Sequence, residues 1–366
     1  MTLTSRKTAL AGLATLGVSA LLLAGCSAAP TGDSTTAAAS KFLPCMVSDS
    51  GGFDDHSFNE LGKSGLDKAA KDLGVKDIAV ESKSDSDYAP NIDSLLSQGC
   101  NLIITVGFNL SAASLAAAKA NPDVDFAIID DAADGDGDGK PDFPNIKPIL
   151  FDTAQSAFLA GYTAASYTKT GKVATWGGMN FPTVTIFMDG FAQGVSYYNK
   201  EKSKSVQVLG YDPANPGAAT FTGGFEANDA AKTVAKNFID QGADIVVPVG
   251  GPIYQSAVAA IQDSGKDVAL VGVDADLFLT DPTTDALVLT SIEKGIEPAT
   301  TAVIEDAAGG DFSNTPYIGT LKNDGVGIAP FHNFESKVDS GLQGELDKIK
   351  AGIISGDIKV TSYLNG

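Results

Sequence analysis

Short runs of β-branched and apolar residues alternate along this chain with longer segments of helical periodicity. A run of four to eight such residues indicates a strand, and apolar positions three and four apart indicate a helix. The pattern predicts strands at 45–48, 77–81, 102–106, 126–129, 172–176, 206–211, 245–249, 269–273 and 286–291. It predicts helices at 58–73, 91–98, 111–120, 154–167, 183–199, 227–241, 252–264 and 298–308. Strands joined by helices form parallel sheets, so we expect an α/β protein of two doubly wound parallel-sheet lobes.

The segment 49–60 joins the first predicted strand to the first predicted helix, and it holds a carboxylate, a glycine pair and an aromatic ring. In a parallel α/β sheet, ligands bind at such strand ends. Ser57 and Glu60 have the spacing of a capping box, which predicts that they cap the helix and fix the position of Phe58. The alternative is an ordinary strand–helix loop in which Phe58 is only a hydrophobic anchor.

The loops after the other predicted strands share this position and pool aromatic rings, amides, carboxylates and glycines. Apolar faces with a few placed polar groups are typical of a small-molecule cleft. For any single glycine loop, turn chemistry alone is the alternative. The loops are Gly107-Phe108-Asn109, the run from Gly177 to Pro182 with Met179, the stretch with Phe221 and Phe225, Gly250-Gly251-Pro252, Asp274-Ala275-Asp276, and Lys294.

The N-terminus has the shape of a secretory signal. Arg6 and Lys7 precede an apolar stretch that is shorter than a membrane-spanning helix requires. The stretch ends in Leu23-Ala24-Gly25-Cys26, which resembles the lipobox of bacterial lipoproteins. We therefore expect residues 1–25 to be a lipoprotein signal peptide, Cys26 to carry lipid, and residues 26–40, rich in small and polar residues, to be a flexible tether. The folded part is then held at the extracytoplasmic face of the cell membrane.

The charge of the chain narrows the range of partners. The formal net charge is −20, and removal of Arg6 and Lys7 with the signal peptide makes it −20 − 2 = −22. Such an acidic protein is unsuited to nucleic acid or anionic lipid headgroups. The two histidines, His56 and His332, stand in unrelated contexts, and the chain has no nucleophile elbow, HExxH or GxGxxG motif. We expect a binding protein and not an enzyme, and no cofactor is required.

Two cysteines remain besides Cys26, and each opens a predicted strand: Cys45 and Cys100. If those strands are parallel neighbours, their starting ends lie about 5 Å apart, which a disulfide can bridge. The expected compartment is oxidising, which favours the disulfide over two buried thiols.

An aspartate-rich loop follows the fourth predicted strand. Asp134, Asp136, Asp138 and Asp142 form a DxDxDG pattern with a further aspartate. Oxygen ligands at alternate positions suit Ca²⁺, although an EF-hand would end in glutamate where this loop has Asn145. We expect a structural calcium site, helped by Asp130 or Asp131, because these carboxylates otherwise repel one another. The alternative is a solvated acidic loop.

Several motifs in order carry a family resemblance over residues 42–334. They are Ser48-Asp49, Gly52, Asp54-Asp55, Ser57-Phe58-Asn59, Gly107-Phe108, Ala157-Phe158-Leu159-Ala160-Gly161, Gly171-Lys172-Val173, Gly177-Gly178-Met179, Gly190-Phe191, Gly194, Gln241-Gly242-Ala243-Asp244, Gly272-Val273-Asp274, and Leu289-Thr290-Ser291 with Lys294. In these stretches the chain resembles the basic membrane protein family of substrate-binding lipoproteins, also called the purine nucleoside receptor A type. That resemblance implies a type I periplasmic-binding-protein fold.

The resemblance also implies the ligand and its contacts. A nucleobase is expected between Phe58 and Phe225, with Phe221 competing for the second place, and such stacking contributes roughly 1–3 kcal/mol per base. Asp49 is expected to accept hydrogen bonds from the base edge beside Asn109. Asp274, or alternatively Asp276, and Lys294 are expected at the ribose hydroxyls, with Gly251 allowing close backbone approach. The matched motifs add Asn59, Phe108 and Met179 to the expected ligand-binding residues.

The mechanism implied is closure of two lobes about a hinge around a nucleoside, with a purine expected, followed by docking to the permease of an ABC importer. We expect a monomer in which residues 41–151 and 274–310 form the N-terminal lobe, and residues 152–273 and 311–366 form the C-terminal lobe. A sugar or autoinducer binder of the same fold is the alternative function.

Overall fold

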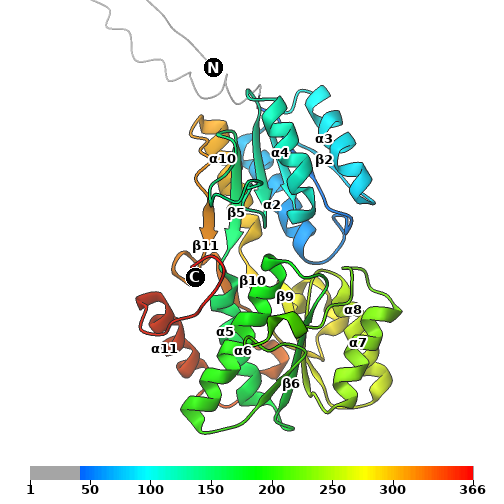
Figure 1. Cartoon of the computed structure of the whole chain (residues 1–366), viewed down its shortest axis with the longest axis vertical. Helices are drawn as coiled ribbons and strands as arrows, with labels where there is room; N and C mark the ends of the chain where they lie inside the picture. The colour runs from blue at the N-terminus through cyan, green and yellow to red at the C-terminus, as the bar shows by residue number, and fades with distance from the viewer. Residues whose placement is uncertain (1–41, 366) are drawn as a thin grey trace, which may run out of the picture.

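The computed structural model describes residues 42–365, which form two α/β lobes, one above the other in Figure 1. The predicted signal peptide, the tether and the lipidation site Cys26 lie outside the described residues. All the predicted strands and helices form, with boundaries shifted by a few residues. Both sheets are almost entirely parallel, as the alternation of strands and helices predicts.

The first lobe contains a six-stranded parallel sheet in the order β11-β5-β4-β3-β1-β2. Its strands are β1 (Pro44–Val47), β2 (Ile78–Val80), β3 (Leu102–Val106), β4 (Asp125–Ile129), β5 (Ile146–Phe151) and β11 (Tyr317–Gly319). Its helices are α2 (Phe58–Leu73), α3 (Tyr88–Ser97), α4 (Ser111–Ala120) and α10 (Ile296–Gly309). Helix α2 packs against α10, and α3 against α4.

The second lobe contains a sheet in the order β12-β10-β9-β8-β6-β7, in which β12 alone runs antiparallel to its neighbour. Its strands are β6 (Lys172–Gly177), β7 (Gln207–Leu209), β8 (Ile245–Val249), β9 (Ala269–Asp274), β10 (Val288–Lys294) and β12 (Val326–Ile328). Its helices are α5 (Thr153–Tyr167), α6 (Pro182–Lys202), α7 (Asp229–Asp240), α8 (Ile253–Ser264), α9 (Leu277–Thr280) and α11 (Leu342–Ser355). Short 3₁₀ turns lie at Asp85–Asp87, Phe108–Leu110, Pro216–Ala218, Pro282–Thr284, Leu321–Asn323 and His332–Phe334.

The strands are buried on both faces because each sheet is covered by helices on both sides. In β1, Met46 belongs to the core beneath α2, together with Leu66, whereas Cys45 and Val47 belong to the core beneath α3, together with Ile92. Cys45 and Cys100 form a disulfide with an S–S distance of 2.00 Å, at the start of the neighbouring strands β1 and β3.

Three segments cross between the lobes, and they divide the chain differently from the expected boundaries. Strand β10 pairs with β9 and so belongs to the second sheet, although residues 274–310 were expected in the first lobe. After β10 the chain returns to the first lobe at α10 and continues to β11, which pairs with β5. It then crosses back to the second sheet at β12. The other crossing joins β5 to α5. Strand β10 belongs to the second sheet because its backbone forms hydrogen bonds with β9 on one side and with β12 on the other.

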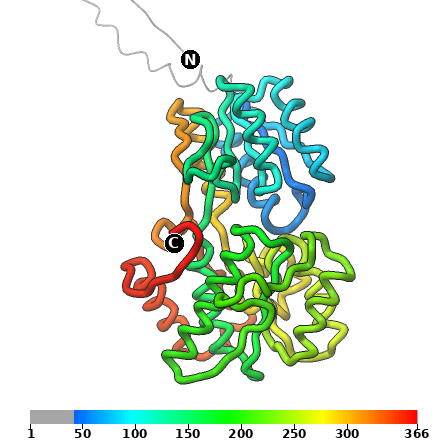
Figure 2. Tube along the Cα trace, in the orientation of Figure 1, coloured from blue at the N-terminus to red at the C-terminus, as the bar shows by residue number. Residues whose placement is uncertain are grey.

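Three strands and two helices were not predicted. Strand β5 contains Pro148, which argues against a strand in sequence. Strands β11 and β12 have only three residues each and lack an apolar run. Helix α11 contains Gly344 and Gly352, and α9 has a single turn. The red C-terminal end in Figure 2 returns to the junction of the lobes, where Asn365 donates a hydrogen bond to Asp152.

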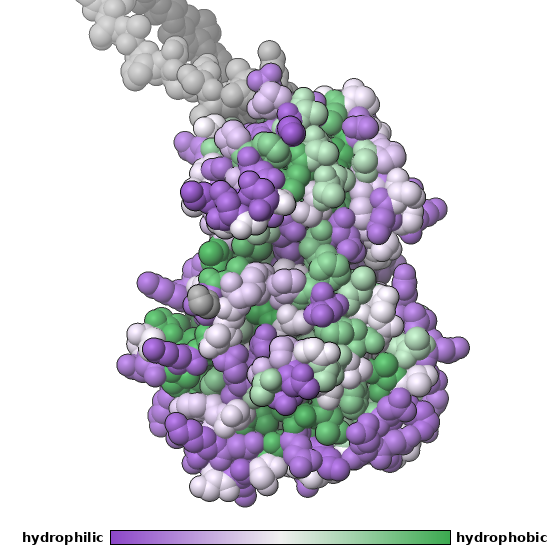
Figure 3. Space-filling view, in the orientation of Figure 1, coloured by the Kyte–Doolittle hydropathy of each residue, from purple (hydrophilic) through white to green (hydrophobic). Residues whose placement is uncertain are grey.

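Hydrophilic residues cover the outer margins of both lobes on the face seen in Figure 3. No helix in residues 42–365 is long and apolar enough to span a bilayer.

Candidate ligand-binding site

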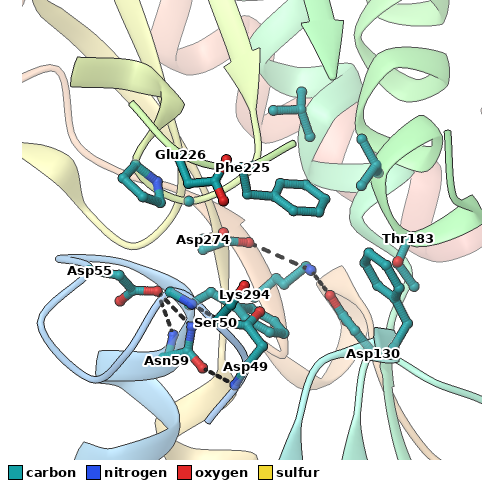
Figure 4. Close-up of a pocket in the computed structure, with 18 of the residues that line it drawn as sticks. Asp49, Ser50, Asp55, Asn59, Asp130, Thr183, Phe225, Glu226, Asp274 and Lys294 are labelled. Atoms are coloured by element: carbon teal, nitrogen blue, oxygen red, sulfur yellow. Dashed lines mark hydrogen bonds and ion pairs between the residues drawn. The ribbon is translucent and has the colours of Figure 1, made fainter. Parts of the chain in front are cut away.

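A cleft of about 700 Å³, including the part open to solvent, lies between the two lobes. The residues around it come from the carboxyl ends of strands in both sheets, from the loops that follow them and from the first turns of helices α2 and α6, as expected for a parallel α/β protein. They are Asp49, Ser50, Gly51, Asp55, Phe58, Asn59, Phe108, Asp130, Thr183, Val184, Phe187, Phe225, Glu226, Val249, Gly250, Gly251, Pro252, Asp274 and Lys294. Figure 4 shows most of these side chains facing one another across the cleft.

Asp49 stands directly after β1 and is held by its own loop. Its Oδ1 accepts hydrogen bonds from the Gly51 amide and from Asn59 Nδ2, both at 2.8 Å. Asn59 Oδ1 in turn accepts from the Asp49 amide at 3.1 Å. Burial raises the pKa of the Asp49 carboxyl to about 6, although these hydrogen bonds act in the opposite direction. The Asp49 carboxyl thus lies at one side of the cleft, and the buried Asn59 amide holds it there.

The capping box predicted for α2 does not form. Ser57 makes no side-chain cap, and Asp55 takes that part instead, since its carboxylate accepts hydrogen bonds from the amides of Ser57, Asn59 and Glu60. Asp55 is buried and also accepts from Asn59 Nδ2. The Ser57 hydroxyl is drawn away because it bonds the second lobe, at the Val273 carbonyl and at Asp274 Oδ2, both 3.2 Å away.

Two phenylalanine rings enter the cleft from opposite lobes, and glycines make room for both. Phe58 starts α2 in the first lobe and lies against Gly107, where a Cβ would stand 3.4 Å from the ring. Phe225 lies in the second lobe against Gly178 and Gly250, and a Cβ on either would stand 2.4 Å from its ring. Neither glycine could carry a side chain without displacing Phe225, so the absence of a Cβ at these two positions makes room for the ring.

Lys294 lies at the end of β10 and is almost fully buried, with 3% of its side chain exposed. Its ammonium pairs with Asp130 of the first lobe, and it lies 3.5 Å from Asp274 of the second. Burial alone lowers the pKa of Lys294, but the two carboxylates raise it above its ordinary value. Burial raises the pKa of Asp130 and of Asp274. The ammonium of Lys294 is therefore charged. Its ion pair with Asp130 connects the second lobe to the first.

Asp130 and Asp274 share an unusual backbone conformation. Their φ angles are 63° and 68°, in the left-handed region that non-glycine residues rarely adopt. Asp130 directly follows β4 and Asp274 is the last residue of β9, so the turn of the chain at each strand exit aims both carboxylates at Lys294. Backbone strain of this kind concentrates at functional sites.

The structure brings most of the predicted site residues to the cleft: Asp49, Phe58, Asn59, Phe108, Phe225, Gly251, Asp274 and Lys294. It does not bring Asn109 or Met179 there. Gly107, with φ of 102°, turns the chain so that Phe108 lines the cleft and Asn109 does not.

The alternatives Phe221 and Asp276 also lie outside the lining. Phe221 packs on Gly177 within the second lobe, where a Cβ on that glycine would stand 3.0 Å from its ring. Asp276 Oδ2 lies 2.7 Å from His332 Nε2. The cleft is thus lined by Phe225 and not by Phe221, and by Asp274 and not by Asp276.

Sequence reasoning missed several residues of the cleft, chiefly Asp55, Asp130, Thr183, Phe187 and Glu226. Asp130 directly follows β4, so the same strand-exit rule that selected Asp49 and Asp274 also applied to it. It was considered only as a helper of the acidic loop.

The acidic loop lies apart from the cleft lining. One carboxylate oxygen from each of Asp134, Asp136 and Asp138 lies within 4.8 Å of the others. The Asp134 carboxylate already accepts hydrogen bonds from the amides of Gly137, Asp138 and Gly139, and Asp142 accepts one from Gly135. The oxygen donors suit a divalent cation, and calcium there stays a prediction.

Known proteins resemble this chain over most of its length. The sequence profile of the family described as ABC transporter substrate-binding protein PnrA-like matches residues 42–360. Basic membrane protein A of Borreliella burgdorferi is 29% identical over 314 residues, 85% of this chain and 86% of that protein. The ABC transporter nucleoside-binding protein BmpA of Lactococcus lactis is 28% identical over 361 residues, 94% of this chain and 96% of that protein.

Solved structures agree on the fold. An ABC transporter solute-binding protein from Aeropyrum pernix matches with a TM-score of 0.75 and 24% identity, over 88% of this chain and 93% of that chain. The predicted type I periplasmic-binding-protein fold is confirmed.

Proposed function

This chain belongs to the family of PnrA-like ABC transporter substrate-binding proteins, and from that premise we propose that its ligand is a nucleoside, with a purine preferred. Proteins of this class act outside the cytoplasm and deliver a small molecule to a membrane permease. The relative from Lactococcus lactis is named as a nucleoside-binding protein, which supports the same ligand class here.

The observation that carries the proposal is the pair of phenylalanine rings that enter one cleft from opposite lobes. Phe58 rests on Gly107, and Phe225 rests on Gly178 and Gly250. A flat, apolar ring between them gains stacking on both faces only when the lobes are closed, so a nucleobase would stabilise the closed form. Each stacked base contributes roughly 1–3 kcal/mol in comparable sites.

The polar groups of the cleft suit the rest of a nucleoside. Asp49 offers a carboxylate to the edge of a base, and Asn59, whose amide nitrogen donates to Asp49 and Asp55, holds that carboxylate in place. Asp274 Oδ1 is buried and accepts no hydrogen bond from residues 42–365, so a ligand hydroxyl can donate to it. Lys294 beside it can donate to a second hydroxyl oxygen. Adjacent hydroxyl groups on a ribose match this arrangement.

The charge of the cleft supports a neutral ligand. Five carboxyl groups line it against a single ammonium group: Asp49, Asp55, Asp130, Glu226 and Asp274 against Lys294. A phosphorylated ligand would meet excess negative charge at short range, whereas a nucleoside offers N–H and O–H donors to the carboxylates.

We also propose that Cys26 carries a lipid anchor, that the protein works as a monomer, and that residues 26–40 tether the two lobes to the membrane. Membrane fractionation of the wild type and of Cys26→Ser tests the anchor. The variant is expected in the soluble fraction, and a variant that stays with the membrane would contradict lipidation at this residue.

Isothermal titration tests the ligand. The purified protein is titrated with adenosine, guanosine, inosine, cytidine and uridine, and with ribose and galactose as controls. Micromolar or tighter binding of a nucleoside, with no turnover, is the expected result. A response to a sugar and none to any nucleoside would keep the fold and overturn the ligand.

A further inference from the structure

A second aromatic contact joins the lobes at the edge of the cleft. The ring of Phe108, in the first lobe, lies 4.0 Å from the ring of Phe181, in the second, measured between centroids and with planes 34° apart. Phe108 also meets Phe225 edge-on, with centroids 6.0 Å apart. Three rings thus form a continuous row across the interface between the lobes.

Both rings of the close pair are held by rigid turns. Phe108 begins the 3₁₀ turn Phe108–Leu110, which Gly107 closes by accepting a hydrogen bond from the Leu110 amide. Phe181 precedes Pro182, which confines it to the extended backbone observed, with φ of −124° and ψ of 151°. Its carbonyl accepts from the amides of Val184 and Thr185 in the first turn of α6. The backbone of each phenylalanine is therefore fixed to its own lobe. The contact between the rings depends on the relative orientation of the two lobes.

The two rings differ in their relation to the ligand site. Phe108 lines the cleft, whereas Phe181 does not. Two polar contacts between the lobes, Lys294 with Asp130 and Ser57 with Asp274, include carboxylates that line the cleft and can exchange their partners for a ligand. The contact between Phe108 and Phe181 is apolar. Neither ring therefore has to exchange a hydrogen-bond partner when a ligand enters the cleft.

We propose that Phe108 and Phe181 form an aromatic latch that stabilises the closed arrangement of the lobes and slows ligand release. Opening the lobes separates the rings and exposes both faces to water. Aromatic pairs contribute stabilisation beyond the area that they bury. Phe181 is thus a positioning residue that acts on the ligand through Phe108 and the closed state.

Stopped-flow kinetics of Phe181→Ala test the latch, with the nucleoside that binds best to the wild type. We expect the dissociation rate constant to rise roughly three- to tenfold while the association rate constant stays within about twofold, since the closed state alone is weakened. Phe278→Ala is the matched control, because Phe278 is also half-buried in the second lobe but stacks on His332 of the same lobe. It should leave both rate constants unchanged.

Small-angle X-ray scattering of the unliganded variants gives a readout that needs no ligand. Phe181→Ala should show a larger radius of gyration than the wild type and Phe278→Ala. The kinetic arm rests on the proposed nucleoside, so if no nucleoside binds the wild type, that proposal fails and scattering alone decides the latch.

A faster dissociation or a larger radius of gyration supports the latch. Unchanged values of both overturn it and leave Phe108 and Phe181 as ordinary packing. Phe181→Leu, which keeps most of the apolar volume, replaces the alanine variant if that variant does not fold, and should show the same changes to a smaller extent.

Discussion

Replacing Asp49 by asparagine should stabilise the unliganded protein while weakening its ligand binding. The substitution keeps the shape of the side chain, and the amide oxygen can still accept the hydrogen bonds that Gly51 and Asn59 donate at 2.8 Å. The substitution removes a negative charge from a partly desolvated position. Burying that charge lowers the stability of the folded protein, whereas the N–H donors on the edge of a base bind more strongly to a charged carboxylate.

The magnitude follows from the pKa. Burial raises the pKa of Asp49 from 3.8 to about 6, and each unit corresponds to about 1.4 kcal/mol, giving an upper bound of ~3 kcal/mol. Because the side chain keeps some contact with solvent in the cleft, we expect ~1–2 kcal/mol. With an unfolding entropy of about 2 cal/mol/K per residue, that raises Tm by roughly 1.5–3 °C. Loss of hydrogen bonds to a charged acceptor should weaken nucleoside binding roughly ten- to hundredfold.

The effect has a defined dependence on pH. The folded state holds the Asp49 proton at a higher pH than the unfolded state does, so the unfavourable contribution to stability is fully present above pH 6. It shrinks as pH falls from about 6 towards 3.8, because over that interval the folded state takes up the proton while the unfolded state stays ionised. Below 3.8 the carboxyl is neutral in both states and the contribution is gone. Asp49→Asn should therefore lose its advantage in Tm over that interval, and nucleoside binding to the wild type should weaken as pH falls through 6.

Thermal unfolding of unliganded protein between pH 4 and 8, with titration calorimetry at each pH, measures both effects. Asp54→Asn is the matched control, because it removes the same charge from an exposed position in the same loop. An Asp49→Asn variant that melts no higher than the wild type at pH 7.5, or a difference in Tm that does not change with pH, would refute the unfavourable charge at Asp49.

Three further experiments test the stacking on Phe58, the packing between α5 and α6, and the acidic loop. Phe58→Ala should weaken nucleoside binding roughly 5- to 150-fold by calorimetry, whereas Phe53→Ala, in the same loop but outside the cleft lining, should not; equal affinities would reject stacking on Phe58. Gly161→Ala should destabilise the protein by about 1–3 kcal/mol in denaturant unfolding, because its Cβ would stand 2.1 Å from the Phe191 carbonyl oxygen between α5 and α6. Gly344→Ala, in open space on α11, should instead gain up to about 1 kcal/mol; similar effects at both glycines would contradict the packing argument. Calcium should raise Tm with a Kd on the order of 10⁻⁴–10⁻³ M, and the double variant Asp136→Asn, Asp138→Asn should abolish the rise; a wild type that shows no response to calcium would leave a solvated acidic loop.

Much of the site was accessible from the sequence because its signals are local. The position of loops directly after predicted strands is visible in the sequence and indicated the loops that carry Asp49, Phe58, Phe225 and Lys294, and the family resemblance then assigned these residues to a ligand. The same local rule failed for the cap of α2, where Ser57 and Glu60 have the right spacing but Asp55 accepts the amides. A contact with Asp274, 217 residues away, outweighed the capping preference of Ser57.

The sequence by itself determined the type and approximate limits of most elements, the two-lobed α/β class, and which loops stand at strand exits. Apolar periodicity records which face of each element is buried, and this depends on residues three or four positions apart. Only the tertiary structure decided that β10 belongs to the second sheet, that Asp130 meets Lys294 across 164 residues, and that Phe108 stacks on Phe181. These contacts depend on how complete sheets and lobes pack, and periodicity within one element carries no information about its distant partner.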